Sequence, residues 1–177
     1  SCFPKDVQAL AFMAKQKGLD PRILNDAVEV NYNRRRDVPK QVEALLGGNL
    51  RGKTVGMLGL AFKENTDDMR DAPSVDISNA LIAAGAKVRA YDPVARKSAA
   101  PLMPAVEIID DVYAMAEGCD ALVVVTPWNE FKQLNLEKIK SRMKNPVIYD
   151  GRNIYDPPRM KEMGFNYRAI GRPTNGA

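Results

Sequence analysis

The chain has 177 residues, of which 45% are hydrophobic, and this is enough for one well-packed core without a metal or a disulfide. Its 26 basic and 22 acidic residues are scattered, so the net charge of +4 permits binding of small anions but gives little reason to expect a nucleic-acid partner. There is no histidine, so acid-base chemistry would need carboxylate, lysine, tyrosine, thiol or water, which excludes many hydrolase mechanisms.

Cysteine usage and hydropathy indicate a cellular compartment. Cys2 and Cys119 lie far apart in a sequence that shows no signal peptide and no long apolar run, so we expect neither a disulfide framework nor a membrane span. A reducing cytoplasm is the expected location. The sequence starts at Ser1 without a methionine, and we interpret the chain as a fragment of a longer protein.

Two helices are predicted at the N-terminal end of the chain. Apolar residues recur at helical spacing over residues 6–19, and Gly18 is suited to end that helix. Pro21 is suited to the first turn of a second helix, which can continue past Pro39 with a kink. The three arginines at residues 34–36 would point to different faces of that helix, so at most two of them could serve one site.

A glycine-rich break separates these helices from the rest of the chain. Residues 47–49 read Gly-Gly-Asn, so we assign residues 1–47 to a helical segment and residues 48–177 to a second domain. There, short apolar runs alternate with amphipathic stretches. The predicted strands are 54–60, 87–91, 121–125, 147–149 and 167–170, and the predicted helices are 75–84, 112–117, 136–143 and 158–163. This alternation predicts an α/β fold, a Rossmann-like parallel sheet with helices on both faces, whose ligands bind at the carboxyl ends of the strands.

The first predicted strand ends in a glycine-bearing turn, Gly-Leu-Ala-Phe at residues 59–62, of the kind that lets a backbone approach a phosphate. The dinucleotide motif G-x-G-x-x-G occurs nowhere in the chain. A complete NAD pyrophosphate site is therefore not expected in this sequence. The alternative interpretation is a Rossmann-like turn that binds no ligand.

The loop that follows, residues 63–73, is longer and more polar than most connections between a strand and a helix, which is typical of a functional loop. Lys63 and Arg70 could neutralise phosphates, and Ser74 could cap the next helix. The alternative is a solvated loop whose opposite charges pair with one another. Its aspartates lack the glycine and the terminal glutamate of a calcium-binding loop, so we expect no metal.

Two further positions carry candidate chemistry. Cys2 has Lys5 nearby, and Asp6 would open a helix, so a thiolate there could find positive surroundings, although a lone cysteine near a terminus is more often inert. Cys119 is interpreted as structural. Arg152 follows the fourth predicted strand in an Asp-Gly-Arg sequence, where it could reach an anion or simply lie on the surface.

Four segments together resemble the UDP-glucose/GDP-mannose dehydrogenase family. They are Ser-Cys-Phe-Pro-Lys-Asp at residues 1–6, Gly-Leu-Ala-Phe-Lys at 59–63, Asp-Met-Arg-Asp-Ala-Pro-Ser at 68–74 and Tyr-Asp-Gly-Arg at 149–152. Their order and separation also match, and the resemblance spans essentially the whole chain. It implies an NAD-dependent oxidation of the C6 alcohol of UDP-glucose to UDP-glucuronate. It also implies that the family's N-terminal NAD-binding domain is missing, so we expect the chain alone not to catalyse the oxidation.

The resemblance assigns roles to residues near the start of the chain. Cys2 matches the family's nucleophile, which would hold the sugar aldehyde as a thiohemiacetal and then as a thioester, with an NAD molecule accepting a hydride in each oxidation. Asp6 matches a carboxylate that assists water and proton movement. Lys5 neighbours both and would support the anionic intermediates.

The resemblance assigns further roles in the second domain. Phe62, Lys63 and Arg152 match residues that contact the nucleotide sugar, and Arg70 matches a residue that reaches the NAD site. The helix that starts at Pro21 resembles the family's dimerisation helix, so a homodimer is the expected assembly.

Other interpretations stay open. The chain could belong to a related nucleotide-sugar dehydrogenase that acts on GDP-mannose or a UDP-N-acetylhexosamine, because most residues that recognise the sugar would lie outside it. It could also be a non-catalytic nucleotide-binding module, which would keep the sheet and the loop but have no reactive Cys2. A receiver-like domain of flavodoxin type fits the strand and helix alternation but explains neither the first segment nor the long loop.

Overall fold

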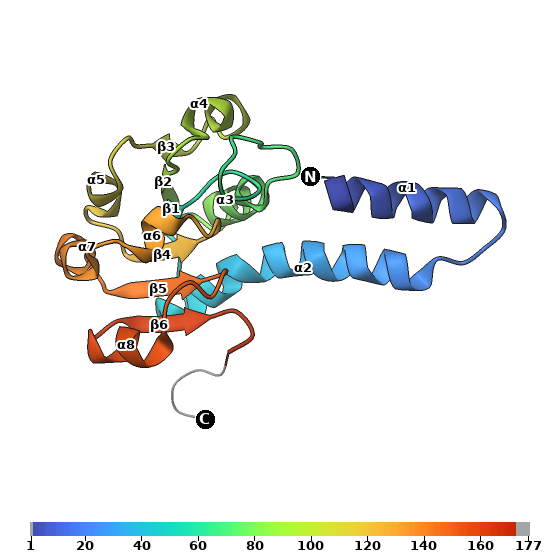
Figure 1. The fold of residues 1–177 in the computed structure, drawn as a ribbon. Helices are drawn as coiled ribbons and strands as arrows, with labels where there is room; N and C mark the ends of the chain where they lie inside the picture. The colour runs from blue at the N-terminus through green and yellow to red at the C-terminus, as the bar shows by residue number, and fades with distance from the viewer. Residues whose placement is uncertain (1, 173–177) are drawn as a thin grey trace.

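The computed structural model describes residues 2–172, with side chains from Pro4 onward. Two helices come first, α1 (Cys2–Gln16) and α2 (Arg22–Leu45), and they form an antiparallel hairpin that projects from the rest of the molecule (Figure 1). Gly18 takes a left-handed φ of +72° in the turn between them, a conformation that glycine adopts without steric cost. The first helix begins earlier than predicted, because Pro4 falls in its first turn, where the missing N–H costs no helical hydrogen bond.

The second helix continues unbroken through Pro39. Proline removes one helical hydrogen bond, and burial offsets that cost here, since Val38, Pro39 and Val42 are the buried residues of α2. All three lie in the C-terminal half of the helix. This half packs on the α/β unit, and the N-terminal half extends beyond it together with α1 (Figure 1).

The rest of the molecule is an α/β unit built on parallel strands. Within residues 2–172 they form one six-stranded sheet in the order β3-β2-β1-β4-β5-β6. The strands are β1 (Thr54–Leu58), β2 (Lys87–Tyr91), β3 (Glu107–Ile108), β4 (Ala121–Val124), β5 (Val147–Asp150) and β6 (Asn166–Ala169). All of them except β3 agree with the predicted strands to within two residues. The prediction missed β3, because two residues are too few to show a periodic pattern.

Helices cover both faces of the sheet, which confirms the predicted α/β class. Besides α2 they are α3 (Pro73–Ala83), α4 (Arg96–Ala99), the 3-10 helix η1 (Ala100–Leu102), α5 (Val112–Ala116), α6 (Asn129–Lys132), α7 (Leu136–Arg142) and α8 (Pro157–Glu162). One core cluster joins Val42 of α2 and Leu81 of α3 to the sheet, and the other joins Met115 of α5, Ile139 of α7 and Met160 of α8 to its opposite face. The single-turn helices α4, η1 and α6 were not predicted.

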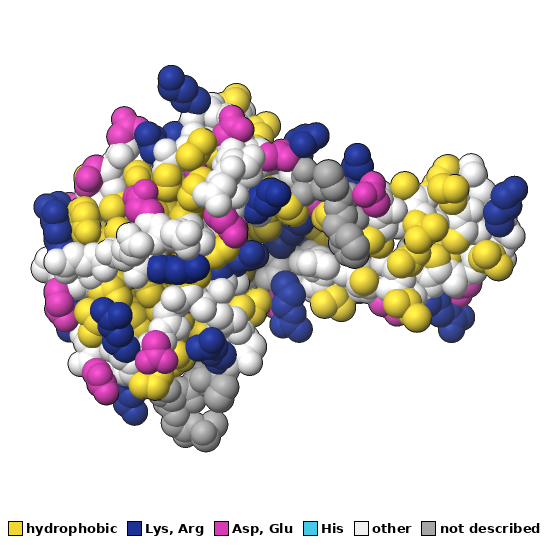
Figure 2. All heavy atoms as spheres, in the orientation of Figure 1, with side chains coloured by type: hydrophobic (Ala, Val, Ile, Leu, Met, Phe, Trp, Pro, Cys, Tyr) yellow, Lys and Arg dark blue, Asp and Glu magenta, His cyan; other side chains and the backbone are white. Residues whose placement is uncertain are grey.

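The projecting hairpin carries most of the large exposed apolar side chains of the described residues. Figure 2 shows them as a yellow patch over the two helices. On the hairpin they are Leu10, Phe12, Met13, Leu19, Ile23 and Val30, each more than half exposed. None of the helices described in residues 2–172 combines the length and hydropathy needed to cross a bilayer.

Candidate functional site

The strand order reverses between β1 and β4, and ligands of open α/β sheets bind outside the carboxyl ends of the strands at such a point. Two turns meet there, one after each strand. Gly59 has a left-handed φ of +92°, and a Cβ on it would lie 2.4 Å from the Thr126 Cβ. Glycine is therefore required for both the backbone conformation and the close packing of the two turns.

Asp92, at the end of β2, organises the turn after β1. Its carboxylate is fully buried. It accepts hydrogen bonds from the backbone N–H of Leu60 (2.7 Å) and Ala61 (3.2 Å) and from Nε1 of Trp128 (3.1 Å). The amides that would face a diphosphate in a dinucleotide-binding turn are thus already satisfied by an internal carboxylate. This explains in structural terms why the sequence here departs from the dinucleotide motif.

Two hydroxyl groups hold the same turn from its other side. Ser74 Oγ donates to the Leu60 carbonyl at 2.6 Å, and Thr126 Oγ1 donates to the Ala61 carbonyl at 2.7 Å. The prediction that Ser74 caps the following helix is wrong, because α3 begins at Pro73 and its N-cap is Ala72, which makes no side-chain cap hydrogen bond. Ser74 instead lies inside the helix and fixes the turn.

The long loop after β1 is closed by its own hydrogen bonds. The Phe62 N–H donates to the Asp68 carbonyl at 2.9 Å, so residues 62–68 form a compact excursion. The Phe62 side chain is half-buried against the core cluster below it, and Lys63 is exposed. Arg70 is exposed, and its Nε and Nη2 each donate to the Asp68 carboxylate at 2.9 Å. Charge pairing within the loop, one of the two interpretations of its sequence, therefore occurs at Arg70.

Arg35 of α2 ties this loop to both helices beside it. Its guanidinium makes two hydrogen bonds to the Asp71 carboxylate (2.8 and 3.1 Å) and one to Asp76 of α3 (2.8 Å), and it lies 4.9 Å from the centre of the Tyr32 ring. Its side chain is only 12% exposed. Asp71 has a left-handed φ of 54°. These contacts of Arg35 with Asp71 and Asp76, the Arg35 clamp, fix the backbone next to Arg70. The sequence alone did not single out Arg35 for this role.

Arg152 lies in a turn that the Asp150 carboxylate builds. Asp150 is fully buried and accepts from the N–H groups of Arg152 and Ile154 and from the Tyr167 hydroxyl, each at 2.8 Å. Burial, followed by the Asp150 charge, raises the pKa of Tyr167, so its hydroxyl stays a donor. A Cβ on Gly151 would lie 2.9 Å from the Val124 carbonyl, so glycine is needed here as well. The turn leaves the Arg152 side chain exposed.

The structure therefore brings three of the predicted site residues to one edge of the sheet. Phe62 and Lys63 follow β1 and Arg152 follows β5, with β4 between the two strands. Neighbouring strands lie about 4.8 Å apart, so these segments start about 10 Å from each other. Neither Lys63 nor Arg152 has an acidic side chain as a partner within residues 4–172. A sheet edge that carries two unneutralised cations is suited to a phosphorylated ligand.

The predicted residues at the start of the chain lie on α1. The Cys2 side chain falls outside the described residues, and Lys5 and Asp6 are exposed. Because α1 runs antiparallel to α2, its first turn points back toward the α/β unit (Figure 1). Cys119 is fully buried, its thiol donates to the Met115 carbonyl at 3.1 Å, and burial raises its pKa to about 11. This matches the structural role expected for Cys119.

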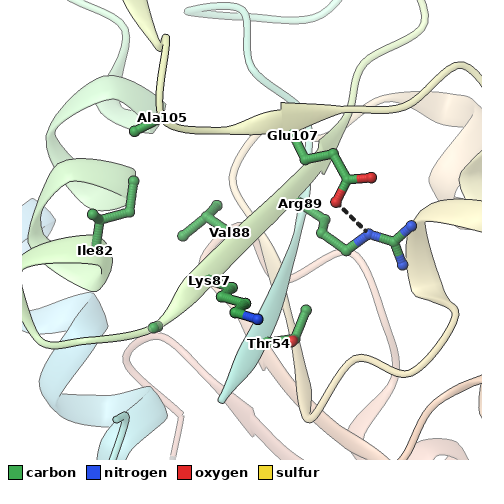
Figure 3. A pocket seen from close by; sticks show the side chains of 8 residues that line it. Thr54, Ile82, Lys87, Val88, Arg89, Ala105 and Glu107 are labelled. Atoms are coloured by element: carbon green, nitrogen blue, oxygen red, sulfur yellow. Dashed lines mark hydrogen bonds and ion pairs between the residues drawn. The ribbon is translucent and has the colours of Figure 1, made fainter. Parts of the chain in front are cut away.

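A hollow of about 360 Å³ lies at the opposite, amino-terminal edge of the sheet (Figure 3). Thr54, Lys87 and Glu107 line it, and each begins a strand. Arg89 also lines it, but Arg89 donates to Glu107 at 3.1 Å and to the Glu117 carbonyl at 2.7 Å. Its cation therefore has a structural role. Within residues 4–172 no group of three or more His, Cys, Asp or Glu side chains is arranged to hold a metal ion.

Sequence comparison relates the chain to a known family. Residues 56–157 match the model of the UDP-glucose/GDP-mannose dehydrogenase family, UDP binding domain. The UDP-glucose 6-dehydrogenase of Rhizobium meliloti is 44% identical over 173 residues, which cover 98% of this chain and 40% of that protein. The UDP-glucose 6-dehydrogenase of Pseudomonas aeruginosa is 45% identical over 183 residues, which cover 99% of this chain and 40% of that protein. The chain thus spans about 40% of the length of these relatives.

Solved structures give the same relationship. A UDP-glucose dehydrogenase from Pyrobaculum islandicum matches with a TM-score of 0.78 at 33% identity, over 87% of this chain and 34% of that one. A UDP-D-ManNAc dehydrogenase from Pyrococcus horikoshii matches with a TM-score of 0.75 at 31% identity, over 97% of this chain and 38% of that one. Together with the family match, these comparisons show that the chain belongs to the UDP-glucose/GDP-mannose dehydrogenase family and contains its UDP-binding domain.

Proposed function

We propose that this chain is the nucleotide-sugar half of an NAD-dependent UDP-glucose 6-dehydrogenase, which oxidises UDP-glucose to UDP-glucuronate. The observation that carries the proposal is the pair of cations, Lys63 and Arg152, at the carboxyl ends of β1 and β5 on either side of β4. Both are exposed and lack an acidic partner among the described residues. The relatives that are 44% and 45% identical over nearly the whole chain are named for UDP-glucose, which favours it over GDP-mannose or a UDP-N-acetylhexosamine as the substrate.

In this proposal each residue of the sheet edge contacts a different part of the ligand. Lys63 acts as a point charge on the diphosphate, and the planar guanidinium of Arg152 binds oxygen atoms of the same nucleotide from the other side. The half-buried ring of Phe62 gives the nucleotide an apolar surface, because one of its faces packs on the core. The capped turn at Asp92 and the Asp150 turn hold these three side chains in place before the ligand arrives.

NAD, when bound, supplies the hydride acceptor for both oxidations. The described residues offer it one proposed contact, Arg70, held by Asp68 and flanked by the Arg35 clamp. They do not offer a pyrophosphate cradle, because Asp92 occupies the amides of the β1 turn. We therefore assign the binding of the dinucleotide to an N-terminal domain, in the part of the relatives' length that this chain does not span.

Cys2, Asp6 and Lys5 form the proposed chemical centre on the first turns of α1. The Cys2 thiolate adds to the carbon of the C6 aldehyde and forms a thiohemiacetal, which is oxidised to a thioester. Water then attacks the thioester carbon, the carbon–sulfur bond breaks, and the carboxylate leaves with Cys2 restored. Asp6 takes the proton from that water, and Lys5 stabilises the oxyanion of the tetrahedral intermediates.

We propose two functional regions and a dimer. Residues 1–47 form the helical segment with the nucleophile, and residues 48–177 form the nucleotide-sugar domain. The apolar residues exposed on the α1–α2 hairpin are too many to stay solvated in a stable monomer, so the hairpin is the proposed contact between two copies of the chain. A nucleophilic thiol requires a reducing compartment, which favours the cytoplasm.

Calorimetric titration of the chain with UDP-glucose, UDP and GDP tests the binding proposal. We expect UDP and UDP-glucose to bind more tightly than GDP, and Lys63→Ala and Arg152→Ala each to weaken binding about tenfold or more, because each removes a charge-assisted contact. Lys161→Ala and Arg159→Ala, exposed residues of α8, are matched controls that leave affinity unchanged. Equal binding in Lys63→Ala, Arg152→Ala and the controls would refute the proposed site.

A further inference from the structure

We propose that a second site in this chain, a polar cleft between α2 and the carboxyl ends of β5 and β6, binds a phosphate-type oxyanion. The cleft has a volume of about 390 Å³. Its polar and charged lining comes from Arg34, Asp37 and Gln41 of α2, Tyr149 of β5, and Arg168 and Arg172 in and after β6. None of Phe62, Lys63 and Arg152 lines it, so this inference does not depend on the proposed nucleotide-sugar site.

The charge of the cleft is strongly positive. Three guanidinium groups line it, those of Arg34, Arg168 and Arg172, against the single carboxylate of Asp37. That carboxylate lies 3.6 Å from Arg34 and 3.7 Å from Lys40 of the same helix, so its charge is already shared between two exposed cations. Arg168 and Arg172 have no acidic partner among the described residues. The cleft therefore repels cations and attracts anions.

Arg168 has a hydrogen-bond donor that the protein leaves unused. Its Nη1 donates to Oε1 of Gln41 at 2.7 Å, which fixes the guanidinium on the wall of the cleft. Its Nε is buried and has no hydrogen-bond partner within the described part of the chain, where it is the only such side-chain atom. Burying a donor without a partner costs stability, so such groups call for an explanation. An oxyanion in the cleft would supply the acceptor.

Tyr149 provides a second unused donor on the same wall. It is only 3% exposed, and it lines the cleft. Its hydroxyl has no hydrogen-bond partner within residues 4–172. Burial, followed by the charge of Asp37, raises the pKa of Tyr149, so the hydroxyl keeps its proton and can donate to an anion. A buried N–H and a phenolic O–H thus line one cleft from neighbouring strands.

The donor set identifies the class of ligand. Guanidinium groups from three positions and a phenol surround the cleft, and a phosphate matches them better than a carboxylate does, because it offers more oxygens and a charge of about −1.5 to −2 at neutral pH. The cleft is larger than one phosphate ion, so a small phosphorylated metabolite fits it. A ligand in the cleft would contact α2 directly, because Arg34, Asp37 and Gln41 lie on that helix.

Titration of the whole 177-residue chain with inorganic phosphate, at ionic strength held constant with chloride, tests the inference. Arginine Nε–H signals are followed by ¹H–¹⁵N NMR, and the Arg168 signal is identified by its absence in Arg168→Lys. We expect this signal to shift with saturation at phosphate concentrations on the order of millimolar. Arg172→Ala should weaken binding about tenfold, because it removes one charge-assisted contact. Arg159→Ala, which removes an exposed arginine of α8, should not change the affinity.

Three outcomes would overturn the inference. The first is an Arg168 Nε–H signal that does not move with phosphate. The second is a phosphate affinity that stays the same in Arg172→Ala and in the Arg159→Ala control. The third is binding that is lost in Lys63→Ala and Arg152→Ala but retained in Arg172→Ala, which would place the anion at the proposed nucleotide-sugar site instead.

Discussion

Replacing Asp92 with asparagine removes the carboxylate that holds the turns after β1 and β2 together. Oδ2 accepts from Leu60, Ala61 and Trp128, and Oδ1 accepts from the N–H groups of Val94 (2.9 Å) and Ala95 (2.7 Å). The oxygen of an asparagine side chain can still accept from Leu60, Ala61 and Trp128. Its NH2 group then faces the N–H groups of Val94 and Ala95, which lose their acceptor. Each buried donor left unsatisfied costs about 1–3 kcal/mol, so we expect a loss of about 3 kcal/mol of unfolding free energy.

Urea unfolding followed by tryptophan fluorescence measures this loss at the site itself, because Trp128 is the only tryptophan of the chain and donates to Asp92. For a chain of this size we expect the thermal midpoint to fall by about 6–12 °C. Asp110→Asn is the control, since the Asp110 side chain is 93% exposed and pairs only at the surface with Arg96. A loss below about 1 kcal/mol in Asp92→Asn would refute the role given to this carboxylate.

Three further predictions concern Arg35, Gly59 and Cys119. Arg35→Ala should lower the unfolding free energy by about 1–2 kcal/mol in urea, because it breaks the clamp on Asp71 and Asp76, and an unchanged midpoint would contradict that clamp. Gly59→Ala should cost more than about 2 kcal/mol, because the new Cβ meets Thr126 at a left-handed φ, whereas Gly118→Ala, with open space around its Cβ, should cost only about 1 kcal/mol. Cys119 should resist thiol reagents at pH 8 in the folded chain, because burial raises its pKa to about 11, and it should react in denaturant; rapid labelling of folded Cys2→Ser would show otherwise.

The strands and the class of fold were predictable because their signals are local. The residues of β4 and β5 are all buried, and continuous apolar runs bounded by polar turns mark such strands in a parallel sheet. The Gly-Leu-Ala-Phe-Lys segment and Arg152 could also be assigned to the carboxyl edge of the sheet from the sequence, since each comes at the end of a predicted strand.

The residues that hold the turns and the loop of the site in place were not predictable, because their roles depend on contacts between distant parts of the sequence. Asp92 reads as an ordinary aspartate before a proline, and only the structure shows that it bonds residues 32 and 36 positions away. Arg35 was one of three adjacent arginines, and its partners are 36 and 41 positions away. Asp150 carried a weak signal in its Asp-Gly-Arg sequence, but its bond to Tyr167 required the β5–β6 pairing.

Locating UDP on the chain by crystallography tests the central proposal most directly. We expect the diphosphate at the carboxyl edge of the sheet, between Lys63 and Arg152 and beside the Phe62 ring, with the Asp92 turn unchanged. UDP bound instead in the hollow at the amino edge, lined by Thr54 and Lys87, would contradict the assignment of this site.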